Sequence, residues 1–267
     1  MKKLLIATAA VALVTVGTAS AADLAYKAPP PPPPPPSWTG CYVDGGIGYG
    51  MWNQDHYIET YPGLVPITSS ATSGGRGWLG RIGGGCDYQV APSFVIGAFA
   101  DWDGMSITGN VSTQENIFLG STWISQEQAS EKQTSAWYVG GRIGYLPYPD
   151  LMTFVSGGWT QSHFSSLAEQ LTLLPEPTTG FGFLDHTYQG WFIGGGYEYR
   201  IPWANFHGLY WKTEYRFTEY VAADLPEVFL ATGTPNGFAM NSQKYEQTVT
   251  TSLVWKFSWG GPVVAKY

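Results

Sequence analysis

From Trp38 onward the chain is built of segments in which apolar and polar residues alternate one by one. In the last segment, 248–257, valine, leucine, tryptophan and phenylalanine occupy one parity, while lysine, serine and threonine occupy most of the other. Side chains of a β-strand point alternately to its two faces, so this segment forms a strand with one largely apolar and one fairly polar face. No segment of comparable length has a helical period, which predicts an all-β fold.

Eight segments share this pattern, and all are rich in glycine, tyrosine, tryptophan, valine and isoleucine: 38–52, 77–89, 93–103, 135–146, 151–164, 188–199, 209–220 and 248–257. Short connections, such as "VAP" and "PYP", alternate with connections of about twenty residues near 53–74, 106–131, 166–185 and 221–244. Membrane barrels have short periplasmic turns and long outer loops, whereas soluble sandwiches have less orderly connections. The regular alternation of short and long connections therefore predicts an eight-stranded antiparallel up-and-down transmembrane β-barrel over residues 38–257.

The charged residues within the strands share the parity of the polar and glycine positions. They are Asp44, Arg81, Asp87, Asp101, Arg142, Glu198, Lys212, Glu214, Arg216 and Lys256. The opposite rows carry many Trp, Tyr, Ile and Val side chains, and the interior of eight strands is too narrow for so many rings. We therefore expect the apolar rows to face lipid and the ten charges to form a paired network inside the barrel, because unpaired buried ions are costly.

Aromatic residues at the strand ends predict two girdles at the membrane interfaces. Trp52, Trp78, Trp102, Trp137 and Tyr220 adjoin the long connections; Trp38, Tyr88, Phe94, Tyr145, Tyr199, Trp211 and Phe257 adjoin the short ones. Since lipid tolerates no unpaired strand edge, the last strand is expected to close onto the first.

The N-terminus has the layout of a secretory signal peptide: Lys2 and Lys3, an uncharged run from Leu4 to Val16, then small residues to Ala21. The run is shorter than the roughly 20 residues that cross a membrane as a helix. We predict a signal peptide over 1–21 with cleavage after Ala21.

A Pro-rich linker follows over 22–37, in which Pro29–Pro36 must form a stiff polyproline II spacer. A passive tether is the simpler interpretation; an arm toward peptidoglycan or a proline-binding partner is the alternative. Residues 258–267 form a C-terminal tail beyond the last predicted strand.

Composition limits the partners. Without residues 1–21 the chain has 11 basic and 20 acidic side chains, a formal charge of −9. Nucleic-acid binding needs clustered Lys and Arg, so nucleic acid is not an expected partner.

Two cysteines remain after removal of residues 1–21, Cys41 and Cys86. In an exported protein without a C-x-x-C motif a disulfide is expected, and both lie at the short-turn end of neighbouring strands.

Several motifs resemble one family. "WTGCYVDGGIGYG", "RIGYLPYPDLMTFVSGGW", "GWFIGGGYEYRI" followed by "WKTEYRF", and "LVWKF" are similar to segments of the small outer-membrane barrels of alphaproteobacteria that include the 25 and 31 kDa immunogenic proteins. The resemblance covers about residues 38–257.

The resemblance implies residence in the Gram-negative outer membrane, with lipid and lipopolysaccharide as surroundings, both termini in the periplasm and loops on the surface. It also implies insertion by the barrel-assembly machinery, and structural, antigenic or, for some members, haem-binding roles. Many members carry an acid near Phe99 and end near Phe257, where we expect the last membrane strand to end.

Alternative functions stay open at this point. The inward charges could line a narrow pore instead of plugging it. His163 and Ser165, with Glu176 in the next loop, resemble the base, nucleophile and acid of outer-membrane lipid A deacylases. His56, His163, His186 and His207, with Tyr57 and Tyr61, are scattered haem-ligand candidates. No spacing predicts a metal site or cofactor. The preferred interpretation is a non-enzymatic barrel that supports the envelope and presents surface loops.

Overall fold

The computed structural model describes residues 37–112, 116–119, 122–125, 127–171, 178–202 and 208–257. The predicted signal peptide, nearly all of the Pro-rich linker and the tail 258–267 lie outside these residues. Every regular element in the described ranges is a β-strand. Among them, no helix is long and apolar enough to cross a membrane.

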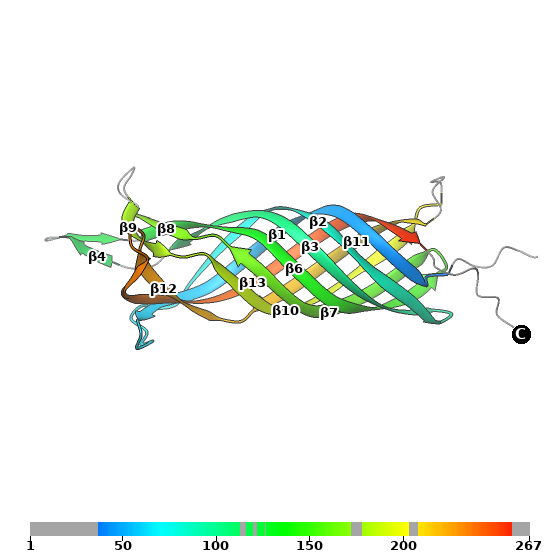
Figure 1. Ribbon diagram of the computed structural model, residues 1–267, viewed down its shortest axis with the longest axis horizontal. Helices are drawn as coiled ribbons and strands as arrows, with labels where there is room; N and C mark the ends of the chain where they lie inside the picture. Colours follow the sequence, from blue (N-terminus) through cyan, green and yellow to red (C-terminus); the bar gives the residue numbers. More distant parts are fainter. Residues whose placement is uncertain are drawn as a thin grey trace, which may run out of the picture. The chain divides into compact units, whose positions relative to one another are not determined.

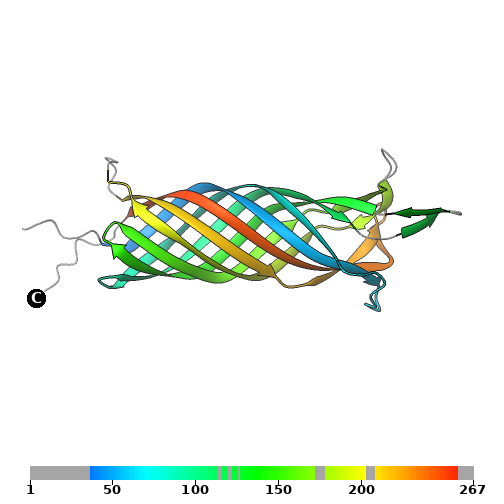
Figure 2. The ribbon, with the colours of Figure 1, turned by 180° about the vertical axis from the view of Figure 1, so that it is seen from behind.

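Eight strands form a closed antiparallel ring (Figures 1 and 2). They are β1 Gly40–Thr60, β2 Ala71–Ala91, β3 Phe94–Ser112, β6 Glu127–Tyr148, β7 Leu151–Phe164, β10 His186–Arg200, β11 Leu209–Tyr220 and β13 Thr234–Phe257. The first and last strands pair without a break from Cys41↔Phe257 to Thr60↔Phe238. The eight-stranded antiparallel barrel and its closure are therefore confirmed.

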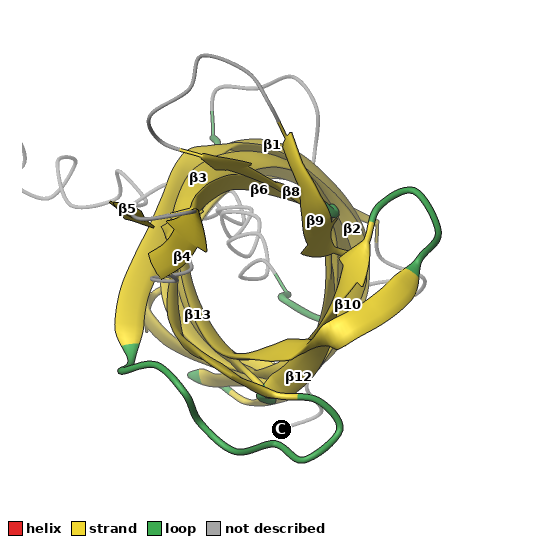
Figure 3. Ribbon diagram, turned by 90° about the vertical axis from the view of Figure 1, so that its left-hand side faces the viewer, coloured by secondary structure: helices red, strands yellow, loops and turns green. Residues whose placement is uncertain are grey.

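A second ring continues the first away from the short turns. Here β8 Leu167–Leu171, β9 Thr178–Phe183 and β12 Ala223–Phe229 take the places of β7, β10 and β11. β6 pairs with β8, β8 with β9, β9 with β12 and β12 with β13, while β1, β2 and β3 run on. Figure 3 views this ring along the barrel axis. We call the ring that contains β7, β10 and β11 the lower tier, and its continuation the upper tier.

The long connections are therefore mostly sheet, and the prediction of four loops of about twenty residues was wrong. β1 runs on to Thr60, β3 to Ser112, and β13 already begins at Thr234. A separate hairpin, β4 Asn116–Leu119 with β5 Thr122–Ser125, occupies part of another connection. The strands were predicted from the alternation of apolar and polar residues, and this alternation stops where the outer face becomes polar. The backbone hydrogen bonds between strands do not depend on the alternation, so the sheet continues beyond it.

The outer face of the lower tier carries the predicted apolar rows. Ile47 is 61% exposed, Trp78 66% and Ile143 59%. We call this set the apolar band; it comprises Val43, Ile47, Tyr49, Met51, Trp78, Ile82, Tyr88, Phe94, Ile96, Trp137, Val139, Ile143, Tyr145, Val155, Trp159, Trp191, Ile193, Tyr197, Tyr199, Trp211, Tyr215, Val249, Leu253 and Trp255. Above it, outward positions on β1 and β3 are mostly polar, such as Asn53 and Asp55 on β1 and Thr108 and Asn110 on β3. A few exposed apolar residues, such as Phe229 on β12 and Phe238 on β13, lie at the far end of the upper tier, apart from the apolar band.

Three predicted girdle residues point inward instead. Trp38, Trp52 and Tyr220 are each 1% exposed or less. Trp52 shares the parity of the inward Asp44 on β1, so parity, not height along the barrel, decides its direction. The Trp38 indole N–H donates to the carbonyl of Pro149, 3.0 Å away, and its ring packs on Tyr210.

Candidate functional site

The barrel interior holds the densest set of chemically active side chains, arranged in layers. The lowest layer lies near the short turns. Arg142 forms two hydrogen bonds with the Asp87 carboxylate, at 2.9 and 2.6 Å, and a third with Glu198 at 3.0 Å. The Lys256 ammonium lies 2.8 Å from Asp87 and 2.9 Å from Glu198. Two cations and two carboxylates from four strands thus neutralise one another.

A second layer crosses the middle of the lower tier. Arg81 holds Asp103 through two hydrogen bonds of 2.8 and 2.7 Å and reaches Glu214 at 3.2 Å. Arg216 lies 2.5 Å from Asp101 and 2.8 Å from Glu214. Rings of Phe99, Tyr138 and Phe192 surround the Arg216 guanidinium at 4.9–5.1 Å. Lys212 pairs with Asp44 at 2.7 Å. Carboxylates and rings together replace water around each cation.

The structure places all ten residues of the predicted network inside the barrel. Each is at most 9% exposed, and each has a partner of opposite charge within 3.2 Å. Asp103 belongs to the same network although the sequence analysis omitted it. It has the parity of Asp101 on β3, and that signal was sufficient to find it.

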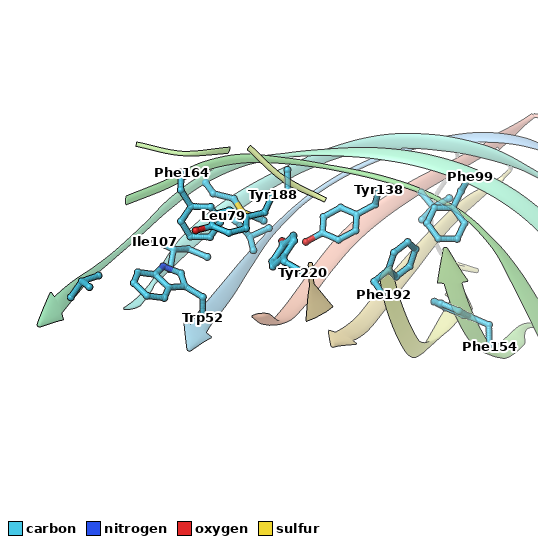
Figure 4. Packing of buried hydrophobic residues seen from close by; sticks show 14 of the residues in the cluster. Trp52, Leu79, Phe99, Ile107, Tyr138, Phe154, Phe164, Tyr188, Phe192 and Tyr220 are labelled. Carbon is cyan, nitrogen blue, oxygen red and sulfur yellow. The ribbon is translucent and has the colours of Figure 1, made fainter. Parts of the chain in front are cut away.

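The upper tier has a different interior. The Lys244 ammonium lies 2.6 Å from the Glu131 carboxylate and also donates a hydrogen bond to the Gln54 side-chain carbonyl. Rings of Trp52, Phe164 and Tyr188 surround it, with centroids 4.7, 4.5 and 5.3 Å away. We call these three rings the aromatic box; Figure 4 shows them beside Tyr220. Lys244 and Glu131 fall in stretches assigned to loops, which is why they were missed.

Glu246 links the two tiers, and none of the described cations forms a salt bridge with it. Its carboxylate accepts hydrogen bonds from the Gln133 amide at 2.7 Å, from the Tyr138 hydroxyl at 3.3 Å and from the Tyr220 hydroxyl. Hydrogen-bond donors therefore do here what arginines do in the layer below. From the short turns to the aromatic box, the described interior is filled by paired polar groups and rings.

Cys41 and Cys86 are joined by a disulfide, as the sequence leads one to expect. The two residues are register partners on β1 and β2. The bridge lies at the short-turn end of the barrel, beside the lowest ionic layer.

The lipid A deacylase motif is not assembled in the described residues. The His163 ring bonds the Thr187 hydroxyl at 3.1 Å and lies 4.0 Å from Asp185, while the Ser165 hydroxyl accepts the backbone N–H of Lys132 at 3.3 Å. No hydrogen bond joins His163 to Ser165 in this part of the chain. Glu176 lies outside the described residues.

The haem-ligand candidates are likewise dispersed. His56 is buried, with one ring nitrogen 2.6 Å from the carbonyl of Ser112. His186 lines a cavity of about 250 Å³ with Leu184 and Leu225, which is below the roughly 300–1,000 Å³ typical of ligand sites. His207 lies outside the described residues, and within them no three His, Cys, Asp or Glu side chains gather as metal ligands would.

Comparison with known proteins supports a location in the outer membrane. No family model matches the chain. The 31 kDa outer-membrane immunogenic proteins of Brucella melitensis and Brucella suis are each 26% identical to it over 265 residues, which cover 96% of this chain and 100% of the relative. The resemblance predicted from the strand motifs is confirmed.

Among solved structures, the outer membrane protein OprG of Pseudomonas aeruginosa has 9% identity and a TM-score of 0.46, covering 82% of this chain and 97% of its own. The outer membrane protease OmpT of Escherichia coli has 12% identity and a TM-score of 0.41, with the same coverage. The chain is an outer-membrane β-barrel protein.

Proposed function

We propose that this outer-membrane barrel, related to the Brucella 31 kDa immunogenic proteins, is a non-enzymatic envelope protein. Its lower tier is a solid membrane plug and its upper tier is a rigid platform on the cell surface. The observation that carries the proposal is the coincidence of two features at one height. The apolar band surrounds the lower tier, and the interior at the same height is filled by the paired ions of its two layers.

The filling opposes a conducting role. Six cations, from Arg81 to Lys256, each contact at least one carboxylate within 2.8 Å. An interior of eight strands leaves space only for side chains, and opening it would separate ions that are costly to leave unpaired. The narrow pore is therefore the second candidate and not the first.

The proposed orientation places both termini and the short turns in the periplasm. Membrane barrels keep short turns on that side and long segments outside. The upper tier, whose outward positions on β1 and β3 are mostly polar, then stands clear of the lipid. A rigid, exposed sheet suits antibody recognition, in keeping with the immunogenic name of the relatives. Insertion by the barrel-assembly machinery, lipid and lipopolysaccharide as neighbours, and contact of the Pro-rich arm with peptidoglycan belong to the same proposal.

Conductance in planar bilayers tests the plugged interior. The full-length mature barrel should give no stable openings of porin size at neutral pH. Removal of cations from the middle layer, in Arg81→Ala with Arg216→Ala, should create openings if the barrel stays folded. Stable openings in the wild-type protein would instead favour the narrow pore.

Two further experiments test the other candidate functions. Identical lipid A acylation in cells with and without the protein would exclude the deacylase. A haemin titration without a Soret shift would exclude haem capture.

Surface exposure is tested separately. In intact cells, a cysteine placed at Asn236, in the β12–β13 hairpin of the upper tier, should react with an impermeant maleimide. A cysteine placed at Asp150, between β6 and β7, should react only after the cells are broken. The reverse pattern would contradict the orientation.

A further inference from the structure

Two cations on the outer wall have no salt-bridge partner among the described residues. The structure describes nine lysines and arginines. Six point inward and pair with acids, and Arg200 lies 3.5 Å from Asp150 at the short-turn end. The remaining two, Arg76 and Lys132, are exposed, and neither forms a salt bridge with any side chain in the described ranges.

These two cations lie in one cross-strand row. Arg76 on β2 is the register partner of Thr108 on β3, and Thr108 is the register partner of Lys132 on β6. Their Cα atoms are therefore two strand spacings apart, roughly 10 Å. The backbone of Lys132 is in turn bonded to Ser165, which adds another hydroxyl beside it. We call Arg76, Thr108 and Lys132 the basic row.

The height of the basic row along the barrel places it at the membrane interface. Arg76 stands two residues above Trp78, which is 66% exposed and ends the apolar band on β2. Exposed tryptophans mark the membrane interface, so the next outward position up the strand lies among lipid headgroups. The row is surrounded by exposed small polar residues, Ser106, Asn110 and Ser130, which leave space for a bulky headgroup.

Charge is unevenly distributed around the barrel at this end. The described outward acids lie mainly elsewhere, on β1, β11, β12 and the β9–β10 turn: Asp55, Glu219, Asp224 and Asp185. The nearest of them in register, Asp55, bonds the Thr72 hydroxyl at 2.6 Å, four residues up β2 from Arg76. In a chain with a net charge of −7, the two outward cations without a salt bridge in the described ranges thus lie together.

We propose that the basic row is a docking site for the phosphate of an outer-leaflet glycolipid, with Arg76 and Lys132 as the phosphate ligands and Thr108 as a hydrogen-bond donor between them. Guanidinium and ammonium groups bind phosphate through charge-assisted hydrogen bonds. A phosphorylated lipid fits because its acyl chains would lie against the apolar band directly below. The inference rests on the proposed orientation, which puts the row in the outer leaflet.

The experiment compares lipid retention by the full-length mature barrel in detergent micelles, counted by native mass spectrometry. The probes are lipid A with two phosphates and the same lipid with its phosphates removed. Wild-type protein should retain the phosphorylated form roughly tenfold more tightly, and Arg76→Gln with Lys132→Gln should remove that preference. Arg200→Gln, which deletes a partly exposed cation at the opposite end, is the matched control and should retain it. Heat-modifiable gel mobility shows that each variant is folded.

Equal retention of the two lipids by wild-type protein, or an unchanged preference in the double variant, would overturn the proposal. Displacement of the lipid by inorganic phosphate at low millimolar concentration would show a simple anion site in place of a lipid site, and would also overturn it. Micelles impose no orientation. The lipid-retention experiment can therefore contradict the docking site while maleimide labelling still places the upper tier outside. Conversely, maleimide labelling can contradict the orientation while the basic row still binds lipid in micelles.

Discussion

The two tiers share five strands but differ on both faces. Below, the wall is apolar outside and ionic inside, with Arg81, Arg142 and Arg216 each holding two carboxylates. Above, the outer wall is mostly polar along β1, β2 and β3, and a single lysine fills the aromatic box inside. Because five backbones pass through both tiers, the difference along those five strands comes from their side chains. The hydrogen-bonded ring sets the shape, and alternating side chains adapt each height to its surroundings.

The largest expected effect comes from breaking an ionic layer of the lower tier. Arg81→Met leaves Asp103 and Glu214 without this counter-ion in an interior far from water. Removing one partner of a buried ion pair costs about 3–5 kcal/mol. Urea unfolding of the barrel in lipid vesicles, followed by tryptophan fluorescence, should show a loss of this size. The control Arg200→Met removes a partly exposed pair and should cost at most about 1 kcal/mol; equal losses would contradict the importance of burial.

The next effect tests the outer faces. Val155, 59% exposed, belongs to the apolar band on β7, below Trp159. Arginine at the lipid-facing midplane of a barrel costs about 2–4 kcal/mol. Val155→Arg should therefore lower the free energy of unfolding in vesicles by that amount. Gln189→Arg, outward on β10 above the band, should leave it nearly unchanged. A large loss at position 189 would mean that lipid also covers the upper tier.

A smaller effect is expected when the upper tier loses its lysine. Lys244→Met with Glu131→Gln removes the salt bridge without leaving a buried carboxylate unpaired, and it keeps an unbranched side chain among the rings of the aromatic box, where a thioether packs favourably. We expect a loss of about 1–2 kcal/mol, below that of Arg81→Met. The same urea experiment measures it. A loss equal to that of Arg81→Met would show that the upper interior depends on its ion pair as strongly as the lower one.

The smallest effect concerns pH at the far end of the upper tier. Glu59 lies eight residues beyond Met51, the last apolar-band residue of β1, and burial and the neighbouring Asp224 raise its pKa. The folded state therefore holds the proton more tightly than the unfolded state. This contribution to stability is complete below the ordinary carboxyl pKa and is lost as pH rises through the raised value.

Hydrogen exchange at Phe238–Met240, which pair with β1 at Ile58–Thr60, should accordingly show more protection at pH 5 than at pH 7 after correction for intrinsic rates. Glu59→Gln should remove the difference, while amides of the lower tier should show none in either protein. A pH difference that survives in Glu59→Gln would assign the effect to another group.

The lower tier was predictable from the sequence because lipid outside and ions inside impose a period of two on every strand. Asp44, Arg142 and Lys256 could be placed inward by parity alone. The upper tier was not predictable in this way, since Asn53 and Asp55 outside and Gln54 and His56 inside leave no apolar contrast to read. The pairing of Lys244 with Glu131, 113 residues apart, depends on a register that only the closed ring defines.

The seam between the first and last strands has a consequence for how the protein reaches its destination. One edge of β1 pairs with the nearby β2, but the other edge, over residues 41–60, pairs with 238–257, the last described residues of the chain. Neither ring can close until nearly all of the described chain has been synthesised. Until then, one edge of β1 and one edge of β13 have no backbone partner, and an edge of this kind is not tolerated in lipid.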